Sequence, residues 1–408
     1  MNDSLPSLAG PASLTGVSSQ SSPLIQASGS EQQRGWRLPV EFTGSGSEYF
    51  RIWIVNMLLL LVTLGIYYPW AKVRRLRYFH SNTVIDGEPL GFHADPKKLL
   101  KGYLLVGAMF ILYSVAGNFS ALAGLLAFVI VMAIWPALLK SSMQFRLANT
   151  SWRGIRFRFK GTVGGAYQAV MPLFIPSVVV LAALTGVADP DKPPRWYAYT
   201  VAGVGVATLA VMPWLLWNLK QYQHNNYALA SLQTTFKASL SSFYGVFFKT
   251  LGVVLLPLAL TGALIGGLLV MGKLGGLSGM GKTASIIFVG VLGSVALLAS
   301  IFVVAKPYMT SRLQNLLWTR TGNSELRFLS NLRFKSLLWL SIKNWLLVVL
   351  TLGLYWPFAA VATARMRLEA VTVKMRQSPE LLVSQIKAAE GEAAGDAAGD
   401  LFGLDIGL

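Results

Sequence analysis

The sequence predicts an all-α integral membrane protein with about eight transmembrane helices in internal repeats, and short β-hairpin units that form a small cytoplasmic cap. Three observations favour this fold class. Of 408 residues, 54% are hydrophobic and 13% are charged. Several apolar runs reach the roughly 18 residues that mark a membrane-spanning helix. A fixed spacing of 13 and then 10 residues recurs, at Pro69-Asn82-Phe92, Pro136-Asn149-Phe159 and Pro213-Asn226-Phe236.

Composition divides the chain into three segments. Residues 1–37 are rich in Ser, Gly, Pro and Gln and nearly free of aromatic residues, which predicts a disordered N-terminal tail. Residues 38–375 form the polytopic membrane domain that holds the repeats. Residues 376–408 are rich in Ala, Gly and acidic residues, which predicts a low-complexity acidic C-terminal tail that is disordered or partly helical.

The first repeat unit extends from Phe42 to Phe92. Its apolar element, 52–70, is just long enough to cross a hydrocarbon core of about 30 Å. Further on, the Asp86-Gly87 pair between β-branched residues favours a tight turn and hence a short hairpin. A similar segment at 151–160 alternates Arg and Phe, which puts charge and aromatic rings on opposite faces of a strand. Several such hairpins would build a cap on one membrane face.

The apolar elements follow in the order one, three pairs, one. The last element matches the first at an offset of 288 residues, with Asn344 opposite Asn56 and Arg365 opposite Arg77. The elements are 52–70, 103–117 with 121–139, 168–187 with 197–217, 246–271 with 284–305, and 337–358.

The distribution of basic residues orients this arrangement. The polar units 70–101, 140–166, 219–245 and 306–336 carry seven, six, two and six Lys and Arg, whereas the three short connections carry none, two and two. The positive-inside rule therefore predicts cytoplasmic repeat units. The length of the first and last elements favours full crossing, which places both tails outside; if these elements are re-entrant, both tails are cytoplasmic.

Basic residues beside the apolar elements are the candidate contacts for an anionic lipid or solute. Their mixture with aromatic residues suits a helix in the headgroup layer. The alternative is that they only anchor the topology. The candidates are Lys72, Arg74, Arg75, Arg77, Arg153, Arg156 and Arg158.

Polar residues inside apolar elements are candidates for an intramembrane site, because burying them in lipid is costly. These are Asn56, Lys343 and Asn344, for which helix–helix hydrogen bonding or snorkelling is the structural alternative. Residues that interrupt helices are candidate hinges, or simply helix terminators. They are Gly65, Pro69, Pro136, Pro213, Pro307, Gly353 and Pro357.

Several function classes are not expected. The chain has no cysteine, and His80, His93 and His224 lack the companions of a metal site. Gly276–Thr283 fits the phosphate-loop pattern GxxxxGK[ST], but its neighbours are long apolar runs rather than a strand and a helix of a soluble domain. The basic runs lack a soluble domain that would present them to nucleic acid. We therefore expect no enzyme activity, no cofactor and no nucleic-acid partner.

The motif Phe42-x-Gly-x-Gly-x-Glu48-Tyr49-Phe50, followed by Thr63–Arg74 and Arg77-Tyr78-Phe79, resembles the YjgN-like family of bacterial inner-membrane proteins. The resemblance covers roughly residues 38–375 and its motifs are specific as a set. It implies a bacterial inner-membrane location and many spans. Because the family is one of unknown function, no catalytic residues carry over.

Two function classes remain. Internal repeats, helix breaks and a basic rim fit a transporter or channel for an anionic or amphipathic solute or lipid. The alternative is a non-enzymatic membrane scaffold or a lipid-binding subunit of a larger complex. The expected partners are membrane lipids, mainly anionic ones, with a homo-oligomer or another membrane protein as a further partner.

Overall fold

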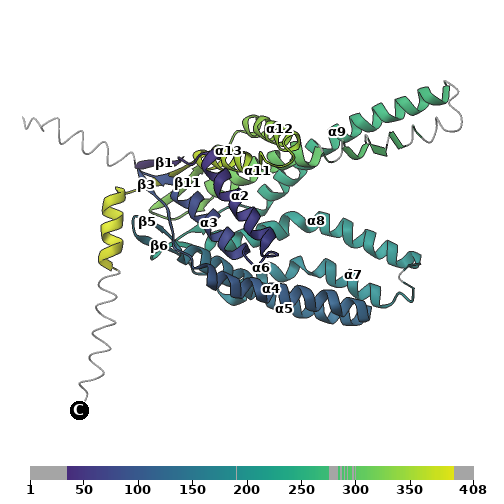
Figure 1. The fold of residues 1–408 in the computed structure, drawn as a ribbon, viewed down its shortest axis with the longest axis horizontal. Coiled ribbons are helices and arrows are strands. Elements are labelled where there is room, and N and C mark those ends of the chain that lie inside the picture. Colours follow the sequence, from purple (N-terminus) through teal and green to yellow (C-terminus); the bar gives the residue numbers. More distant parts are fainter. Residues whose placement is uncertain are drawn as a thin grey trace, which may run out of the picture.

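The computed structural model describes residues 35–389, apart from Pro190, residues 275–283 and scattered positions between 285 and 299. Most of both predicted tails and the glycine-rich segment Gly276–Thr283 lie outside the described residues. The described part consists of a β-rich cap at one end and long helices that extend away from it (Figure 1).

Two antiparallel sheets form the cap. One has seven strands in the order β3-β2-β1-β12-β11-β10-β9, and the other has five in the order β4-β5-β6-β7-β8. Single residues join the edge strands of the two sheets: Leu90 links β3 to β4, and Thr234 links β8 to β9. The bounds of the first sheet are Glu88–Pro89, Thr83–Ile85, Trp36–Phe42, Val371–Met375, Leu326–Ser330, Thr321–Gly322 and Thr235–Phe236, and those of the second are Gly91–Phe92, Thr150–Trp152, Ile155–Phe159, Tyr227–Leu229 and Leu232–Gln233.

Buried and exposed residues alternate along the strands of the cap, so that one face of each strand packs into an apolar core. In β1, Leu38, Val40 and Phe42 are buried, and in β12 Val371, Val373 and Met375 are buried. Side chains from both sheets meet in one apolar core. The predicted hairpin units are therefore present, and the β structure is larger than the name all-α suggests.

Long apolar helices extend from the cap. Four helices in the described residues are long and apolar enough to cross a membrane, and a fifth span is formed if a pair bent by 53° counts as one. Few of the side chains in these windows are buried, as expected for helices that face lipid. The four are α4 (Pro96–Phe119), α5 (Ala121–Ala148), α8 (Arg195–Asn225) and the Leu240–Leu260 part of α9 (Leu240–Leu274), and the bent pair comprises α6 (Val163–Val170) with the 3₁₀ helix η1 (Met171–Leu173), and α7 (Ile175–Thr185).

Eight transmembrane helices are thus not confirmed. The predicted span 284–305 is interrupted by scattered positions outside the described residues, and its end forms the π-helix η2 (Ser300–Ala305) before α11 (Lys306–Thr319). The first and last apolar elements form 17-residue helices, α2 (Gly46–Val62) and α12 (Phe334–Leu350), which are shorter than a typical span.

Each of these terminal helices is the first arm of a helical hairpin. A five-residue turn follows α2, and α3 (Tyr68–Ser81) then returns to β2, which pairs with β1. In the same way α13 (Trp356–Glu369) returns from α12 to β12, which pairs with β11. We call α2–α3 the N-terminal hairpin and α12–α13 the C-terminal hairpin. Both ends of each hairpin are attached to the same sheet, which corrects the expectation that the first and last apolar elements cross fully.

The candidate hinges occupy three kinds of position. Gly65 and Gly353 lie in the hairpin turns with φ of 90° and 94°. Pro69, Pro357 and Pro307 lie in the first turn of α3, α13 and α11, where a proline is well tolerated. Pro136 and Pro213 lie inside α5 and α8, which continue past them. Hinge motion at these positions stays a prediction.

A helix over residues 379–389 follows β12 and packs against the cap (Figure 1). Leu382 and Ile386 are buried in the cap core. Arg153 forms ion pairs with Glu380 at 3.0 Å and with Asp86 at 2.6 Å. This part of the segment predicted as a low-complexity tail is therefore an ordered helix attached to the fold.

Candidate functional site

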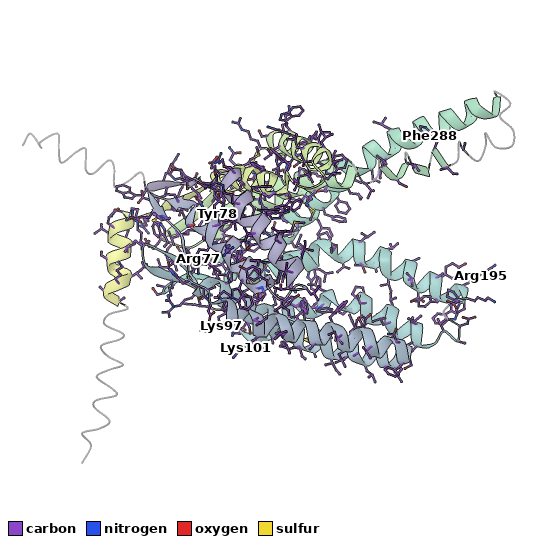
Figure 2. The ribbon with its side chains drawn as sticks, viewed as in Figure 1. Arg77, Tyr78, Lys97, Lys101, Arg195 and Phe288 are labelled. Atoms are coloured by element: carbon purple, nitrogen blue, oxygen red, sulfur yellow. The ribbon has the colours of Figure 1, made fainter. Side chains whose placement is uncertain are left out.

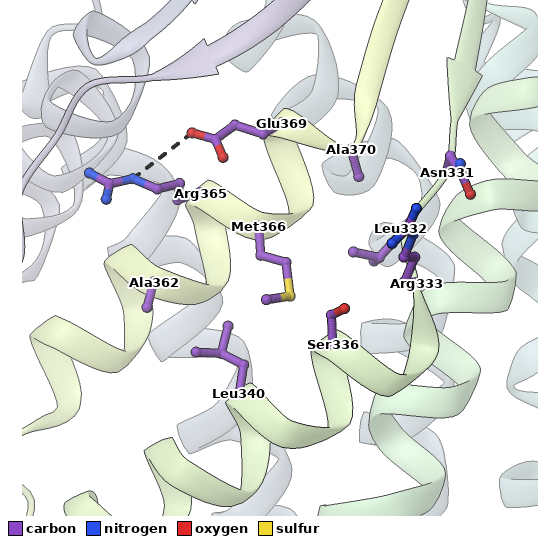
Figure 3. A pocket seen from close by; sticks show the side chains of 10 residues that line it. All are labelled: Asn331, Leu332, Arg333, Ser336, Leu340, Ala362, Arg365, Met366, Glu369 and Ala370. Atoms are coloured by element: carbon purple, nitrogen blue, oxygen red, sulfur yellow. Dashed lines mark ion pairs between the residues drawn. The ribbon is translucent and has the colours of Figure 1, made fainter.

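A pocket of about 430 Å³ that is open to the surface, called the cavity below, lies at the base of the C-terminal hairpin, where α12 begins and α13 ends (Figure 3). Ser336 and Leu340 line it from α12, and Met366 lines it from α13. The remaining lining residues are Asn331, Leu332, Arg333, Ala362, Arg365, Glu369 and Ala370.

The cavity has a positive balance of charge. Its lining includes two arginines, Arg333 and Arg365, and a single carboxylate, Glu369, whose Oε1 lies 4.0 Å from Arg365 Nε. Arg365 Nη2 also donates to the carbonyl oxygen of Gly44 at 2.7 Å, which ties α13 to the start of the N-terminal hairpin. Arg333 forms no ion pair with the described residues. Its guanidinium is therefore available to a ligand.

The start of α12 reinforces this charge. Arg333 is the residue that precedes the helix, and its side chain does not cap the free N–H groups of the first turn. The N-terminus of a helix carries a partial positive charge and unpaired N–H donors. Negative charge is thus favoured at this end of the cavity.

At the base of the N-terminal hairpin, the space that corresponds to the cavity is occupied by the chain's own side chains. Ser45 Oγ accepts a hydrogen bond from the N–H of Glu48 at 3.3 Å and so caps α2. The hydroxyl of Tyr78 donates to the carbonyl oxygen of Ser45 at 2.7 Å and to Glu48 Oε2 at 3.2 Å. Burial, with the adjacent Glu48 carboxylate, raises the pKa of Tyr78 to about 12, so the phenol stays a donor. At the offset of 288 residues, Glu48 and Tyr78 correspond to Ser336 and Met366 of the cavity.

A third unit shows the filled arrangement again. The hydroxyl of Tyr222 in α8 donates to the carbonyl oxygen of Thr162 at 3.0 Å, and Thr162 caps α6. Gly161 before this cap would clash with Phe159 and the Tyr222 hydroxyl if it carried a Cβ. Gly44 has the same relation to Phe42 and Tyr78. Among these three places, the C-terminal hairpin is the one without a tyrosine hydroxyl at the cap.

The two candidate intramembrane asparagines also differ. Asn56 is buried in α2, and its Oδ1 lies 3.5 Å from Arg74 Nη1, a long hydrogen bond. Asn344 is buried in α12, and its Nδ2 lies 3.3 Å from Thr363 Oγ1, but its Oδ1 has no partner among the described residues. Each asparagine thus contacts the second helix of its own hairpin rather than the other asparagine. Position 362, which corresponds to Arg74, is an alanine that lines the cavity.

Comparison with known families fits this membrane architecture. A family model described as "Bacterial protein of unknown function (DUF898)" matches residues 37–401. The chain belongs to the DUF898 family. This confirms the resemblance drawn from the sequence motifs.

Curated relatives of this DUF898 protein are all named for a membrane location. "Inner membrane protein YjgN" of Salmonella typhimurium is 33% identical over 137 residues, which are 33% of this chain and 35% of the relative. The protein of the same name from Escherichia coli K12 is 26% identical over 143 residues, which are 34% of this chain and 35% of the relative. The match therefore spans about a third of the length of these relatives. No solved structure matches the chain.

The predicted basic contacts on α3 lie outside the cavity of this DUF898 protein. Lys72, Arg74, Arg75 and Arg77 are all exposed. Lys72 Nζ lies 5.9 Å from the centre of the Tyr68 ring, and the Arg75 guanidinium lies 6.0 Å from that of Phe79. Figure 2 shows Arg77 with Lys97 and Lys101 near the cap, whereas Arg195 lies at the far end of the long helices.

The predicted basic contacts of the second unit have different surroundings. Arg153 is engaged by Asp86 and Glu380, so it holds the cap and its C-terminal helix together. Arg156 and Arg158 belong to β6 (Ile155–Phe159), where both are exposed on one face of the strand. Lys343 is exposed on α12. The structure does not bring these residues together with the cavity.

Sequence reasoning matched Arg365 to Arg77 but did not single out Arg333 or Arg365 as site residues. The sequence nevertheless contained a signal for this site, in the residues that differ between the two hairpins at the offset of 288 residues. Wherever the N-terminal hairpin has a carboxylate or an aromatic ring that fills its base, the C-terminal hairpin has a smaller or more flexible residue. Comparing the two copies position by position would have indicated the void.

Proposed function

We propose that this DUF898 protein is a multi-pass inner-membrane protein that binds the anionic headgroup of an amphiphile in the cavity of its C-terminal hairpin. The observation that carries the proposal is an open pocket of about 430 Å³ whose lining includes Arg333 and Arg365 and which lies at the uncapped start of α12. In the N-terminal hairpin, the same place is occupied by the chain's own carboxylate, Glu48. An external anion in the C-terminal hairpin would supply what Glu48 supplies in the other.

The size and surroundings of the cavity support a headgroup rather than a whole lipid. Small-molecule sites typically have volumes of about 300–1,000 Å³, so this void lies near the lower end. Arginine guanidinium groups suit phosphate because their N–H donors form a planar fork. Leu340 and Met366 give the wall an apolar part, which fits an amphiphile better than a free inorganic ion.

The membrane setting of this proposal has two supports. The curated relatives are named as inner-membrane proteins, and four helices in the described part of the chain are long and apolar enough to cross a membrane. The basic repeat units favour a cytoplasmic cap by the positive-inside rule. We also propose that the chain is built from internal repeats, because the helices of its two terminal hairpins have the same lengths at an offset of 288 residues.

Transport of the amphiphile or of an anionic solute is the second candidate. The bend of 53° between α6–η1 and α7 and the π-helix at Ser300–Ala305 are the observations that favour it. Interrupted helices of this kind are common where transporters bind and release their substrates. A scaffold or lipid-binding subunit of a larger complex requires no such breaks.

Native mass spectrometry tests the binding proposal. The protein, in detergent, is titrated with phosphatidylglycerol and with phosphatidylethanolamine, and the bound stoichiometry is measured. We expect one tightly bound phosphatidylglycerol that is weakened at least tenfold by Arg333→Gln. The matched control is Arg77→Gln, an exposed arginine outside the cavity, which should leave the affinity unchanged.

Equal loss with Arg333→Gln and Arg77→Gln would reject the cavity as the site. An efflux assay from liposomes then separates the two candidate functions. Efflux of an anionic probe that Arg333→Gln reduces supports transport. Binding without efflux supports the lipid-binding or scaffold role.

A further inference from the structure

The turn of each terminal hairpin exposes a leucine almost completely. Leu64 is 92% exposed and Leu352 is 95% exposed. Both have positive φ, at 48° and 50°. The left-handed conformation is unfavourable for a leucine, and the described fold leaves these side chains too exposed to offset that cost. Burial of each leucine side chain in hydrocarbon would offset this cost.

The backbone of both turns is fixed by the same hydrogen bonds. Thr63 Oγ1 donates to the carbonyl oxygen of Leu59 at 2.7 Å and accepts from the N–H of Tyr67 at 3.1 Å. Thr351 Oγ1 donates to the carbonyl oxygen of Leu347 at 2.7 Å and accepts from the N–H of Tyr355 at 2.9 Å. These hydrogen bonds therefore fix the turn conformation in which Leu64 and Leu352 are exposed.

Apolar side chains continue from each turn down the first helix. On α2 the largest exposures belong to residues next to the turn, and on α12 Leu350 beside the turn is nearly as exposed as Trp339 near the start of the helix. The exposed apolar group at the turns comprises Leu58, Leu61, Val62 and Ile66 in the N-terminal hairpin, and Leu346, Val349, Leu350 and Leu354 in the C-terminal hairpin, all between 51% and 81% exposed.

Charges on the second helix limit how deep the turns can reach. Lys72 lies about one helical turn after the start of α3, and Arg74 follows. A charged side chain deep in hydrocarbon costs several kcal/mol, whereas Lys and Arg stabilise a helix at the headgroup layer. Because α3 is exposed on this basic side, its charges suit the headgroup layer, and the apolar turn before it suits a greater depth.

The attachment of the hairpins to the cap decides their topology. Phe42 before α2 pairs with Thr83 after α3, and Ser330 before α12 pairs with Val371 after α13. A segment whose two ends are neighbours in one sheet cannot end on the opposite face of a membrane.

We propose that both terminal hairpins dip into one leaflet of an anionic phospholipid bilayer and leave it on the same face, with Leu64 and Leu352 in the hydrocarbon. The hairpins are then interfacial anchors beside the spanning helices. The chain segments on either side of them, β1 and the helix over 379–389, stay on the cap side of the membrane. This inference concerns the outer, turn end of each hairpin and does not depend on a ligand in the cavity at its base.

Single-cysteine labelling tests the topology, and the chain offers a cysteine-free background. Arg37→Cys and Glu88→Cys flank the N-terminal hairpin, and Arg327→Cys and Arg376→Cys flank the C-terminal one. Asp191→Cys, in the connection between α7 and α8, reports the other face. With a membrane-impermeant maleimide on spheroplasts and on inverted vesicles, we expect the four flanking sites to be labelled from one face and position 191 from the other. Labelling of Arg37→Cys and Glu88→Cys from opposite faces would overturn the proposal.

A nitroxide label tests insertion of the turns. In phosphatidylglycerol–phosphatidylethanolamine vesicles, a label at Leu64→Cys or Leu352→Cys should collide with oxygen at least severalfold more than with a water-soluble nickel complex. The control label at Glu88→Cys should show the reverse. Turn labels that behave like the control would overturn insertion, even if all four flanking sites share one face.

Discussion

The N-terminal and C-terminal hairpins have helices of equal length at an offset of 288 residues, yet their bases are built differently. The N-terminal base is closed by Tyr78, which stacks on Tyr49 at 5.3 Å and hydrogen-bonds to Ser45 and Glu48. The C-terminal base has Met366 and Ser336 at the corresponding positions and a cavity between them. The two hairpins thus share the lengths of their helices and differ in the side chains at their bases, as the proposed ligand site in only one of them requires.

The two hairpins also depend on each other. Val361 of α13 packs into the core of the N-terminal hairpin with Phe42, Tyr49 and Tyr78. A Cβ on Gly46 would clash with the Phe358 ring. The filled hairpin therefore positions α13, which is one wall of the cavity.

Among these predictions, removing the Tyr78 side chain should change the free energy of unfolding the most. We expect Tyr78→Ala to lower the free energy of unfolding by about 3 kcal/mol, because it removes a buried aromatic ring and its hydrogen bonds. Met366→Ala should cost less than half as much, since Met366 already borders a void. Thermal unfolding in detergent measures both, with Tyr78→Phe as a control that keeps the ring. Equal losses for the two alanine variants would mean that the bases are packed alike.

Giving the C-terminal hairpin its own carboxylate should abolish the difference between the two bases. Ser336→Glu places a carboxylate at the position of Glu48, where it would compete for Arg333 and the start of α12. We expect phosphatidylglycerol binding to weaken at least tenfold, or about 1.4 kcal/mol. Ser336→Gln is the neutral control of similar size. If both variants weaken binding equally, bulk rather than charge is responsible.

A smaller difference in the free energy of unfolding is expected from the surroundings of Asn56 and Asn344. Arg74→Ala should destabilise the protein by about 1 kcal/mol, because it leaves the buried Oδ1 of Asn56 without its donor. Asn344 already has an unpaired Oδ1, so Asn344→Leu should change the free energy of unfolding by less than about 0.5 kcal/mol. Chemical unfolding in mixed micelles measures both, with Arg77→Ala as the surface control. A larger loss for Asn344→Leu than for Arg74→Ala would contradict this contrast.

The smallest expected effect is a pH dependence of the stability of the helix over residues 379–389, which follows the C-terminal hairpin. A hydrogen bond from its own backbone N–H, together with Arg153, lowers the pKa of Glu380 below its ordinary value of 4.5. A lowered pKa in the folded state contributes stability above the ordinary pKa that is lost as pH falls through the lowered value. Hydrogen exchange of residues 381–389, corrected for intrinsic rates, should therefore increase below about pH 4 relative to pH 6.

Glu380→Gln is the control for this titration, because it cannot change charge. Its exchange over 381–389 should be faster than that of the parent at pH 6 and nearly independent of pH. A pH dependence that persists in Glu380→Gln would assign the effect to another carboxyl group.

Much of the local structure followed from the sequence because its causes are local. The Asp86-Gly87 and Arg153-Gly154 pairs form hairpin turns with positive φ, as the sequence motifs predicted. The long apolar runs form α4, α5, α8 and α9. The candidate site was not predicted from the sequence. Arg333 and Ser336 line a pocket only because α13 packs beside the start of α12 without filling the space between them.

The sequence by itself determined which segments are apolar, where turns fall, and that the first and last elements share a motif, since these depend on residues close together in the chain. Only the tertiary structure decided that the terminal elements fold back, that two sheets join into one cap, and that Arg153 forms ion pairs whereas Arg333 forms none with the described residues. The reason is physical: strand pairing between β1 and β12, and the packing of α13 on α2, join residues more than 300 positions apart, and no local pattern specifies them.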